Sequence, residues 1–264
     1  MIETIKNLSN IFFFLVVASI AILSYLQARK TLFAPIRTET FKLQLKAFED
    51  ILAFFQNKSE TDFLEIFDFD RIVSLNTLQM ADSYVSQFFA EELTVDKDAR
   101  KETYAPLIGA IVSKDYMEKY FEKVDTENPM CKSASAGKKI TNPAIVLSNW
   151  QKYEHGMVGY TKEYQDQLKE LTRISASPLL QKPLRELIGR FQALVHENLT
   201  QTGETISNCA KLMPEHFPVA SDMKDFTPNW VWNGFNDKRK HFEPVAKEIL
   251  DYINGYLKIE NLMQ

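Results

Sequence analysis

IFFFLVVASIAIL, at residues 11–23, is the stretch that decides the fold. Ser19 is its only polar side chain, and no charged residue occurs from Asn7 to Ala28. Wound as a helix, an uncharged stretch of this length spans roughly 30 Å, which is about the thickness of the hydrocarbon core of a bilayer. The sequence therefore predicts one transmembrane helix, over residues 8–28.

A cleaved signal peptide is the alternative interpretation of this stretch. Such a peptide has a basic start, a shorter apolar region and a cleavage site of small residues. Here Glu3 offsets the charge of Lys6, and Tyr25-Leu26-Gln27 follows the apolar run where small residues would be needed. We therefore favour a retained anchor.

The basic residues on the two sides of the anchor predict its orientation. Only Lys6 precedes it, and lysine and arginine are enriched on the cytoplasmic side of membrane proteins. We therefore expect the inner (cytoplasmic) membrane, with residues 1–7 as a short non-cytoplasmic tail and residues 29–264 in the cytoplasm. The basic stretch after the anchor should also lie near anionic lipid head groups. Its members are Arg29, Lys30, Arg37, Lys42 and Lys46.

Composition limits what the remainder of the chain can be. About 235 of the 264 residues follow the anchor, enough for one sizeable core or two small ones. The net charge of −4 argues against a general nucleic-acid binder, and two cysteines far apart in sequence fit free thiols in the cytoplasm. With only 8 glycines and few alternating β-branched runs, the sequence predicts an all-α bundle of six to eight helices.

A regular apolar pattern follows the anchor. Pro35 predicts a kink or a fresh helix start. The heptad seam that comes next indicates either a membrane-proximal coiled coil joining several chains or a helix packed on its own domain. It covers only about two heptads and is rich in phenylalanine, so we favour packing within the domain. Its members are Phe41, Leu45, Phe48, Leu52 and Phe55.

Apolar periodicity predicts several further helices. Ser59, with Asp62 three residues later, is typical of a helix start, and Gly203 is a possible break in a long helix. Trp230 and Trp232 predict an irregular, buried aromatic plug, because a spacing of two does not suit one helix face. A flexible basic loop is predicted at Asp125–Pro143. The remaining predicted helices begin at Asp70 and Pro244 or cover residues 106–121, 144–174 and 184–213.

A search for chemistry predicts no metal and no cofactor. None of the four histidines has a glutamate three residues before it, so the Glu-x-x-His pattern of di-iron bundles is missing. The zincin, zinc-ribbon and Gly-x-Ser-x-Gly patterns are missing as well. Cys131 has no histidine near it in sequence. The acidic run at residues 62–70 lacks the glycine and terminal glutamate of a calcium loop, so we interpret it as a solvated face with helix caps.

One match to a catalytic pattern remains. Arg190-Phe-Gln-Ala-Leu-Val-His196 is similar to the Arg-x(4–6)-His signature of HEPN ribonuclease domains. These domains are all-helical and generally cleave RNA as dimers. The resemblance implies that Arg190 stabilises phosphate charge and that His196 transfers a proton. Phe191 stands where that family often has a polar residue.

The spacing of this pair restricts how it can work. On a regular helix, six residues turn two side chains about 120° apart, so they share a site only at an irregularity or with a second chain. The alternative is an arginine on the solvated face and a histidine at the edge of the core. A single-pass anchor with a helical domain also resembles the membrane accessory proteins found beside RNA-targeting CRISPR nucleases.

Two hypotheses about function follow. The leading one is non-enzymatic: interaction and self-assembly at the cytoplasmic membrane face, with membrane lipid and further copies of the chain as partners, and with a membrane effector as one form of it. The alternative is a HEPN-like ribonuclease, or an inactive relative, in antiviral defence, and only this alternative includes RNA as a partner. A ribonuclease needs Arg190 and His196 to converge on a pocket, whereas an assembly protein needs an exposed apolar seam.

Overall fold

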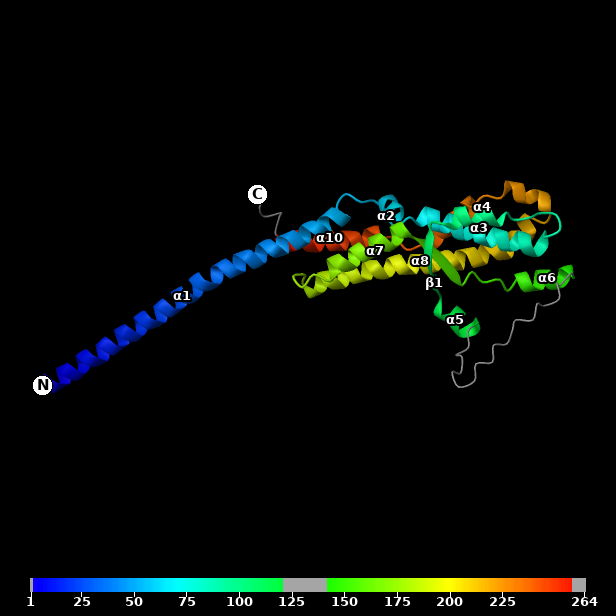
Figure 1. Cartoon of the computed structure of the whole chain (residues 1–264). Helices are drawn as coiled ribbons and strands as arrows, with labels where there is room; N and C mark the ends of the chain where they lie inside the picture. Colours follow the sequence, from blue (N-terminus) through cyan, green and yellow to red (C-terminus); the bar gives the residue numbers. More distant parts are fainter. Residues whose placement is uncertain (1, 121–141, 258–264) are drawn as a thin grey trace. The chain divides into compact units, whose positions relative to one another are not determined.

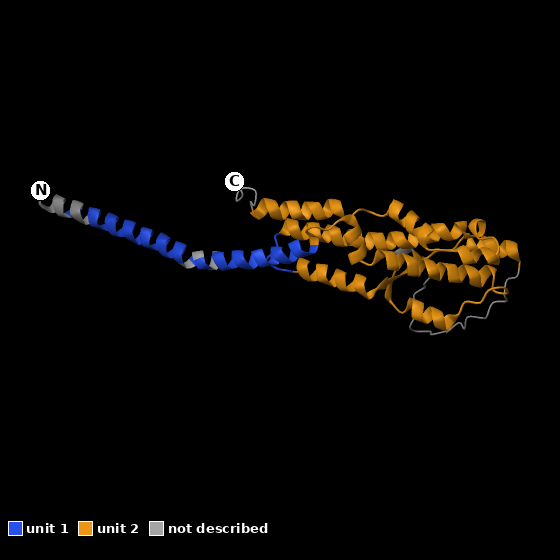
Figure 2. Cartoon of the chain, turned by 90° about the horizontal axis from the view of Figure 1, so that it is seen from above, with its two compact units in different colours: residues 1–54, 177–181 blue, residues 55–176, 182–264 orange. Residues whose placement is uncertain are grey.

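The computed structural model of the chain describes residues 2–120 and 142–257 (Figure 1). The chain divides into two compact units (Figure 2). Unit 1 comprises residues 1–54 and 177–181, and unit 2 comprises residues 55–176 and 182–264. The predicted loop Asp125–Pro143, including Cys131, lies outside the described residues except at its end, where Pro143 begins a helix.

One helix, α1 (Ile2–Phe55), accounts for nearly all of unit 1. It continues through Pro35, so the expectation of a fresh helix start there is wrong. A proline inside a helix removes one backbone hydrogen bond and costs about 3 kcal/mol. A helix of 54 residues has many other bonds that hold the flanking turns in place.

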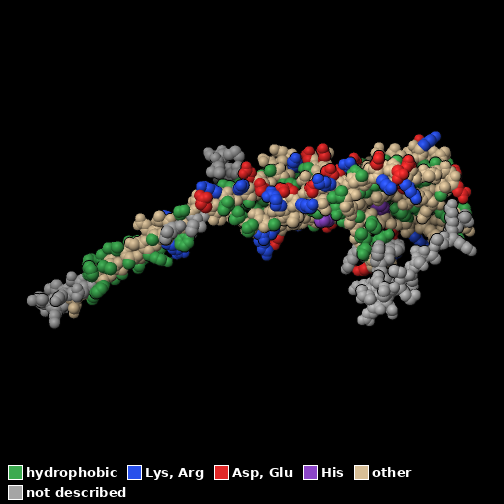
Figure 3. Space-filling view, viewed as in Figure 1, with side chains coloured by type: hydrophobic (Ala, Val, Ile, Leu, Met, Phe, Trp, Pro, Cys, Tyr) green, Lys and Arg blue, Asp and Glu red, His purple; other side chains and the backbone are tan. Residues whose placement is uncertain are grey.

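Within α1, the segment Ile11–Thr31 is long and apolar enough to cross a membrane, and none of it is buried. Figure 3 shows its hydrophobic side chains at the surface with few charges among them. The hydroxyl of Ser19 donates to the carbonyl oxygen of Leu15 at 2.8 Å, so this polar group is satisfied within the helix. That arrangement suits a hydrocarbon environment, where no water is present to bond it.

The heptad seam of α1 divides into an exposed and a buried half. Phe41 and Leu45 are 47% and 38% exposed, whereas Phe48 and Phe55 are each 1% exposed. Packing within the domain therefore fits the second half of the seam. The first half leaves apolar side chains partly exposed in the described chain.

Unit 2 is mainly helical, with more helices than the six to eight predicted and with one small sheet that was not predicted. Its long central helix, α8 (Lys182–His216), is not broken at Gly203 and packs against α3, α7, α9 and α10 (Figure 1). The remaining elements are α2 (Glu60–Ile66), α3 (Phe69–Phe88), α4 (Lys97–Tyr104), β1 (Leu107–Val112), α5 (Lys114–Tyr120), α6 (Pro143–Trp150), β2 (Met157–Thr161), α7 (Lys162–Ser175), the 3₁₀ helix η1 (Ala220–Asp225), α9 (Asn229–Lys238) and α10 (Glu243–Leu257).

The predicted start of α2 is confirmed. Ser59 accepts from the backbone N–H of Asp62 at 3.3 Å, and the Asp62 carboxylate accepts from the backbone N–H of Ser59 at 2.7 Å. The bonds from Ser59 lower the pKa of Asp62, because they stabilise its charged form. The acidic run thus contributes a helix cap, as expected.

The sheet corrects two predicted helices. Residues 107–112 and 157–161 were expected inside helices 106–121 and 144–174, but they form β1 and β2. The strands are antiparallel, with Ala110 opposite Gly159 and Val112 opposite Met157. Their β-branched residues favour the pleated backbone of a strand once a partner strand is available.

Phenylalanine rings form the centre of unit 2. Phe191 is fully buried, and its ring centroid lies 4.9 Å from that of Phe55, 5.2 Å from Phe63 and 5.4 Å from Phe242. Rings at these distances add about 0.5–1.5 kcal/mol per pair to the gain from burial. Core packing therefore explains why position 191 is apolar.

The predicted aromatic plug is wrong in its geometry. Trp230 and Trp232 lie on α9, a regular helix, and both are only half-buried. The residues of α9 that enter the core are Val231 and Phe235. Their spacing of four places them on one helix face.

Candidate functional site

Arg190 lies on the surface of α8 and is paired with α10. Its Nη1 atom is 2.7 Å from Oε2 of Glu248, and its Nη2 atom is 3.3 Å from Oε1. Both side chains are about half exposed, so water screens the pair, and surface pairs contribute at most about 1 kcal/mol. The guanidinium remains accessible but is directed toward a carboxylate of its own chain.

His196 is also exposed on α8 but faces α7. Its Nδ1 atom lies 3.4 Å from the hydroxyl oxygen of Tyr164. Burial raises the pKa of Tyr164, so its hydroxyl keeps its proton near neutral pH and can donate to the imidazole.

The single chain does not bring Arg190 and His196 together. One contacts α10 and the other contacts α7, and α8 is helical through both positions. This agrees with the angular separation expected from their spacing. A shared catalytic site would therefore need a second chain, and the assignment of roles to these two residues stays a prediction.

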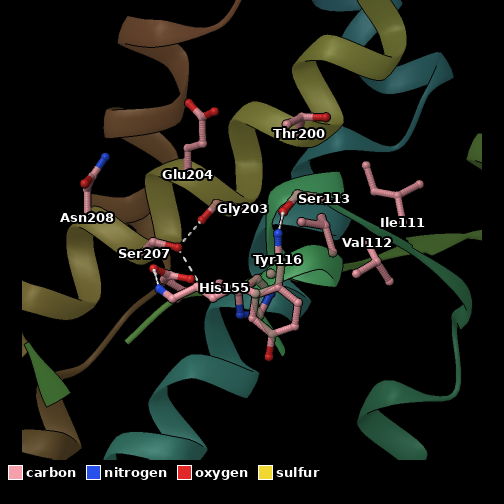
Figure 4. Close-up of a pocket in the computed structure, with 14 residues that line it drawn as sticks. Ile111, Val112, Ser113, Tyr116, His155, Thr200, Gly203, Glu204, Ser207 and Asn208 are labelled. Carbon is pink, nitrogen blue, oxygen red and sulfur yellow. Dashed lines mark hydrogen bonds and ion pairs between the residues drawn. The ribbon is translucent and has the colours of Figure 1, made fainter. Parts of the chain in front are cut away.

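A pocket of about 760 Å³ lies elsewhere on unit 2, between α8 and the end of the sheet (Figure 4). Its size falls within the range of ligand pockets, about 300–1,000 Å³. Neither Arg190 nor His196 lines it. The lining residues are Ile111, Val112, Ser113, Tyr116, Lys119, Glu154, His155, Gly156, Val158, Thr200, Gly203, Glu204, Ser207 and Asn208.

Two glycines allow the walls of this pocket to approach each other. A Cβ atom on Gly203 would lie 2.7 Å from Cγ2 of Val158, and one on Gly156 would lie 1.9 Å from the ring of Tyr116. Real Cβ atoms do not approach other atoms so closely. Gly203, although it costs about 1 kcal/mol inside a helix, therefore lets β2 pack directly on α8.

His155 is the most constrained side chain at the pocket. Its Nε2 atom is 3.1 Å from Oδ1 of Asn76, and its Nδ1 atom is 3.2 Å from the hydroxyl of Tyr153. An amide oxygen only accepts, so Nε2 carries the proton and Nδ1 accepts from Tyr153. Burial lowers the pKa of His155 to about 4, and the ring is therefore neutral at pH 7.

Further polar groups of the pocket are bonded within the chain. The backbone N–H of His155 donates to Ser207 Oγ at 2.8 Å, and that hydroxyl donates to the carbonyl of Gly203, so it has no base to activate it (Figure 4). Lys119 and Glu154 form an ion pair with 2.6 Å between Nζ and Oε1. Among residues 2–120 and 142–257, no group of His, Cys, Asp and Glu could hold a metal ion.

No family model, curated protein or solved structure matches this chain. The similarity to HEPN domains therefore depends on the residues quoted above.

The sequence contained a signal for the pocket that helical periodicity obscured. Gly156 and Gly159 lie close together inside the helix predicted over 144–174, and Val158 and Thr161 beside them are β-branched. Paired glycines argue against a helix interior, and β-branched neighbours favour a strand. This combination marks the start of β2, directly after His155.

Proposed function

We propose that this chain is a single-pass protein of the inner (cytoplasmic) membrane that acts by interaction and self-assembly at the cytoplasmic face. The observation that supports the proposal most directly is the long apolar segment of α1 whose side chains are all exposed. In Ile11–Thr31 nothing is buried, and Phe12 and Phe14 are 70% and 68% exposed.

The exposed area of this segment is the physical argument for an anchor. Soluble monomers rarely expose a contiguous apolar patch of more than a few hundred Å². Each Å² of apolar surface that stays in water forgoes about 25 cal/mol of favourable transfer free energy. Insertion into a bilayer recovers this free energy. The basic residues from Arg29 onward support an orientation in which unit 2 is cytoplasmic.

Exposed apolar side chains beyond the anchor support self-assembly. Phe41, Leu43 and Leu45 are all exposed on the part of α1 that follows the membrane segment. Anchored copies share one plane and one orientation, which raises their effective concentration and removes part of the entropy cost of association. A modest contact is then sufficient, and an assembly of this kind is one way to act on the membrane as an effector.

A fusion experiment tests the topology. A reporter that is active only in the cytoplasm, placed after Gln264, is expected to be active, and the protein should stay in the membrane pellet after alkaline carbonate extraction. Activity of a periplasm-specific reporter at the same position would overturn the orientation and favour the signal-peptide interpretation.

The second candidate is a HEPN-like ribonuclease formed between two chains. The observation that favours it is the exposure of both Arg190 and His196 on α8, where a second copy can reach them. Purified full-length chain should then cleave single-stranded RNA, and His196→Ala should abolish the cleavage. Equal cleavage by wild type and His196→Ala would exclude this site.

A further inference from the structure

The two outer edges of the small sheet differ. The backbone N–H of Ser113 donates to the carbonyl of Gly156 at 3.2 Å, so Ser113 directs its backbone N–H toward β2. Backbone direction alternates along a strand. With the observed register, Ile111 therefore also faces β2, whereas Ala110 and Val112 direct their N–H and C=O groups away from it.

The outer edge of β2 is closed by a side chain. Gly159, opposite Ala110, also directs its backbone groups away from the sheet. The fully buried Asn76 of α3 meets both groups: its Oδ1 accepts from the N–H of Gly159, and its Nδ2 donates to the C=O, each at 2.8 Å. The amide of Asn76 thus occupies the position of a neighbouring strand.

The outer edge of β1 has no side chain that bonds it as Asn76 bonds β2, within the described part of the chain. Within the described part of the chain, no group bonds the outward backbone of Ala110 or Val112, and β1 makes its extensive contacts with β2 alone. Natural edge strands are usually protected by charged residues, proline or a covering element. β1, with the sequence LIGAIV, has no charge or proline, and its bulge lies between Leu107 and Gly109, so the rest of the edge is regular.

We propose that β1 pairs antiparallel with β1 of a second copy, which joins two sheets into one of four strands. This inference rests on the proposed self-assembly and places a contact outside α1. Charge and symmetry both favour a second copy of β1 as the strand that pairs with this edge. An uncharged strand can face itself without opposing like charges, and antiparallel pairing of two identical strands is the self-complementary contact of a two-fold dimer.

The geometry indicates a register for this pairing. With Ile111 on the two-fold axis, Ala110 of each copy faces Val112 of the other, and the outward groups of both residues exchange about four backbone hydrogen bonds. Ile108, which is 48% exposed in the single chain, lies on the same strand two residues from this contact. The contact thus satisfies backbone groups and brings the Ile111 side chains of the two copies together.

A matched pair of substitutions tests the proposal. Ile108→Lys places a charge on the edge of β1, and Ile145→Lys on α6 is its control, because Ile145 is 46% exposed and lies outside the sheet. Native mass spectrometry of the full-length chain in detergent should give a dissociation constant about tenfold higher for Ile108→Lys than for wild type. Ile145→Lys should match the wild type.

A second variant removes a backbone donor instead of adding a charge. Ala110→Pro deletes the outward N–H and leaves the bonds to β2 available, since proline is tolerated on an edge. It should also weaken the dimer, with circular dichroism verifying that the helical content is retained.

The possible outcomes separate this inference from the proposed function. A wild-type monomer at micromolar concentration would overturn self-assembly and this contact together. A wild-type oligomer that both β1 variants leave intact would overturn the β1 contact alone. If Phe41→Glu disperses such an oligomer while the β1 variants do not, the contact lies on α1.

Discussion

At the scale of single residues, His155 connects three parts of unit 2. Its ring bonds Asn76 of α3, and its backbone N–H bonds Ser207 of α8, while the neighbouring β2 continues the chain. Asn76 in turn bonds Gly159 on β2. The neutral imidazole is therefore a structural link that depends on its protonation state.

Acidification should weaken this link. Because burial lowers the pKa of His155 from 6.5 to about 4, the unfolded chain binds a proton in this interval that the folded chain does not. The free energy of unfolding must then fall as the pH drops below about 6.5, by about 2 kcal/mol at pH 5 relative to pH 7. Urea unfolding of the detergent-solubilised chain at the two pH values measures this loss.

The control for that measurement is His155→Gln, which offers an N–H donor to Asn76 and does not titrate. The variant should lose less stability between pH 7 and pH 5 than the wild type, because other titrating groups contribute equally to both. Equal losses would contradict the role assigned to His155.

At the scale of elements, the start of α10 is held by a carboxylate from α2. Oε2 of Glu60 accepts from the backbone N–H groups of Phe242 at 2.8 Å and Glu243 at 3.0 Å, and Arg239 forms an ion pair with Oε1. An acceptor at a helix N-terminus satisfies donors that have no partner within the helix. Glu60 and Arg239 are 15% and 7% exposed, so the pair is largely shielded from water.

Removing this carboxylate should be costly. Glu60→Ala leaves the largely buried charge of Arg239 without a carboxylate partner and should lower the free energy of unfolding by about 3–5 kcal/mol. Glu248→Ala is the matched control, because it removes the partner of the exposed Arg190 and should cost less than about 1 kcal/mol. If the urea midpoints of the two variants shifted equally, the burial of the Glu60–Arg239 pair would not make it more important for stability than the exposed Arg190–Glu248 pair.

The elements also show which features could be predicted from sequence. The cap at Ser59 and Asp62 and the long helix α8 depend on interactions within a few residues, so local patterns predicted them. β1 and β2 depend on pairing between segments far apart in the chain, and each is too short for periodicity to reveal. Arg190 likewise meets Glu248 only through the packing of α10 on α8.

At the scale of the whole molecule, the two halves of the α1 seam should respond differently to the same substitution. Phe48→Glu places an unpaired charge at a buried position and should lower the melting temperature of the full-length chain markedly. Phe41→Glu changes an exposed position and should leave the melting temperature unchanged while it weakens oligomers. Circular dichroism and native mass spectrometry measure the two effects.

One result would reverse this assignment. If Phe48→Glu dispersed oligomers and kept the wild-type melting temperature, the buried half of the seam would be an intermolecular contact. The exposed half would then have no demonstrated role.

Because α1 is one continuous helix through Pro35, any residue inserted after the membrane segment would rotate the side chains that follow it around the helix axis. An α-helix turns about 100° per residue, so a one-residue insertion between Thr31 and Phe41 would swing the Phe41 side of the helix by that angle about the axis of the membrane segment. A seven-residue insertion would change the azimuth by only about 20° while it adds about 10 Å of length. In the membrane assembly proposed above, a longer segment between the anchor and Phe41 would therefore disturb contacts between copies less than a rotated one.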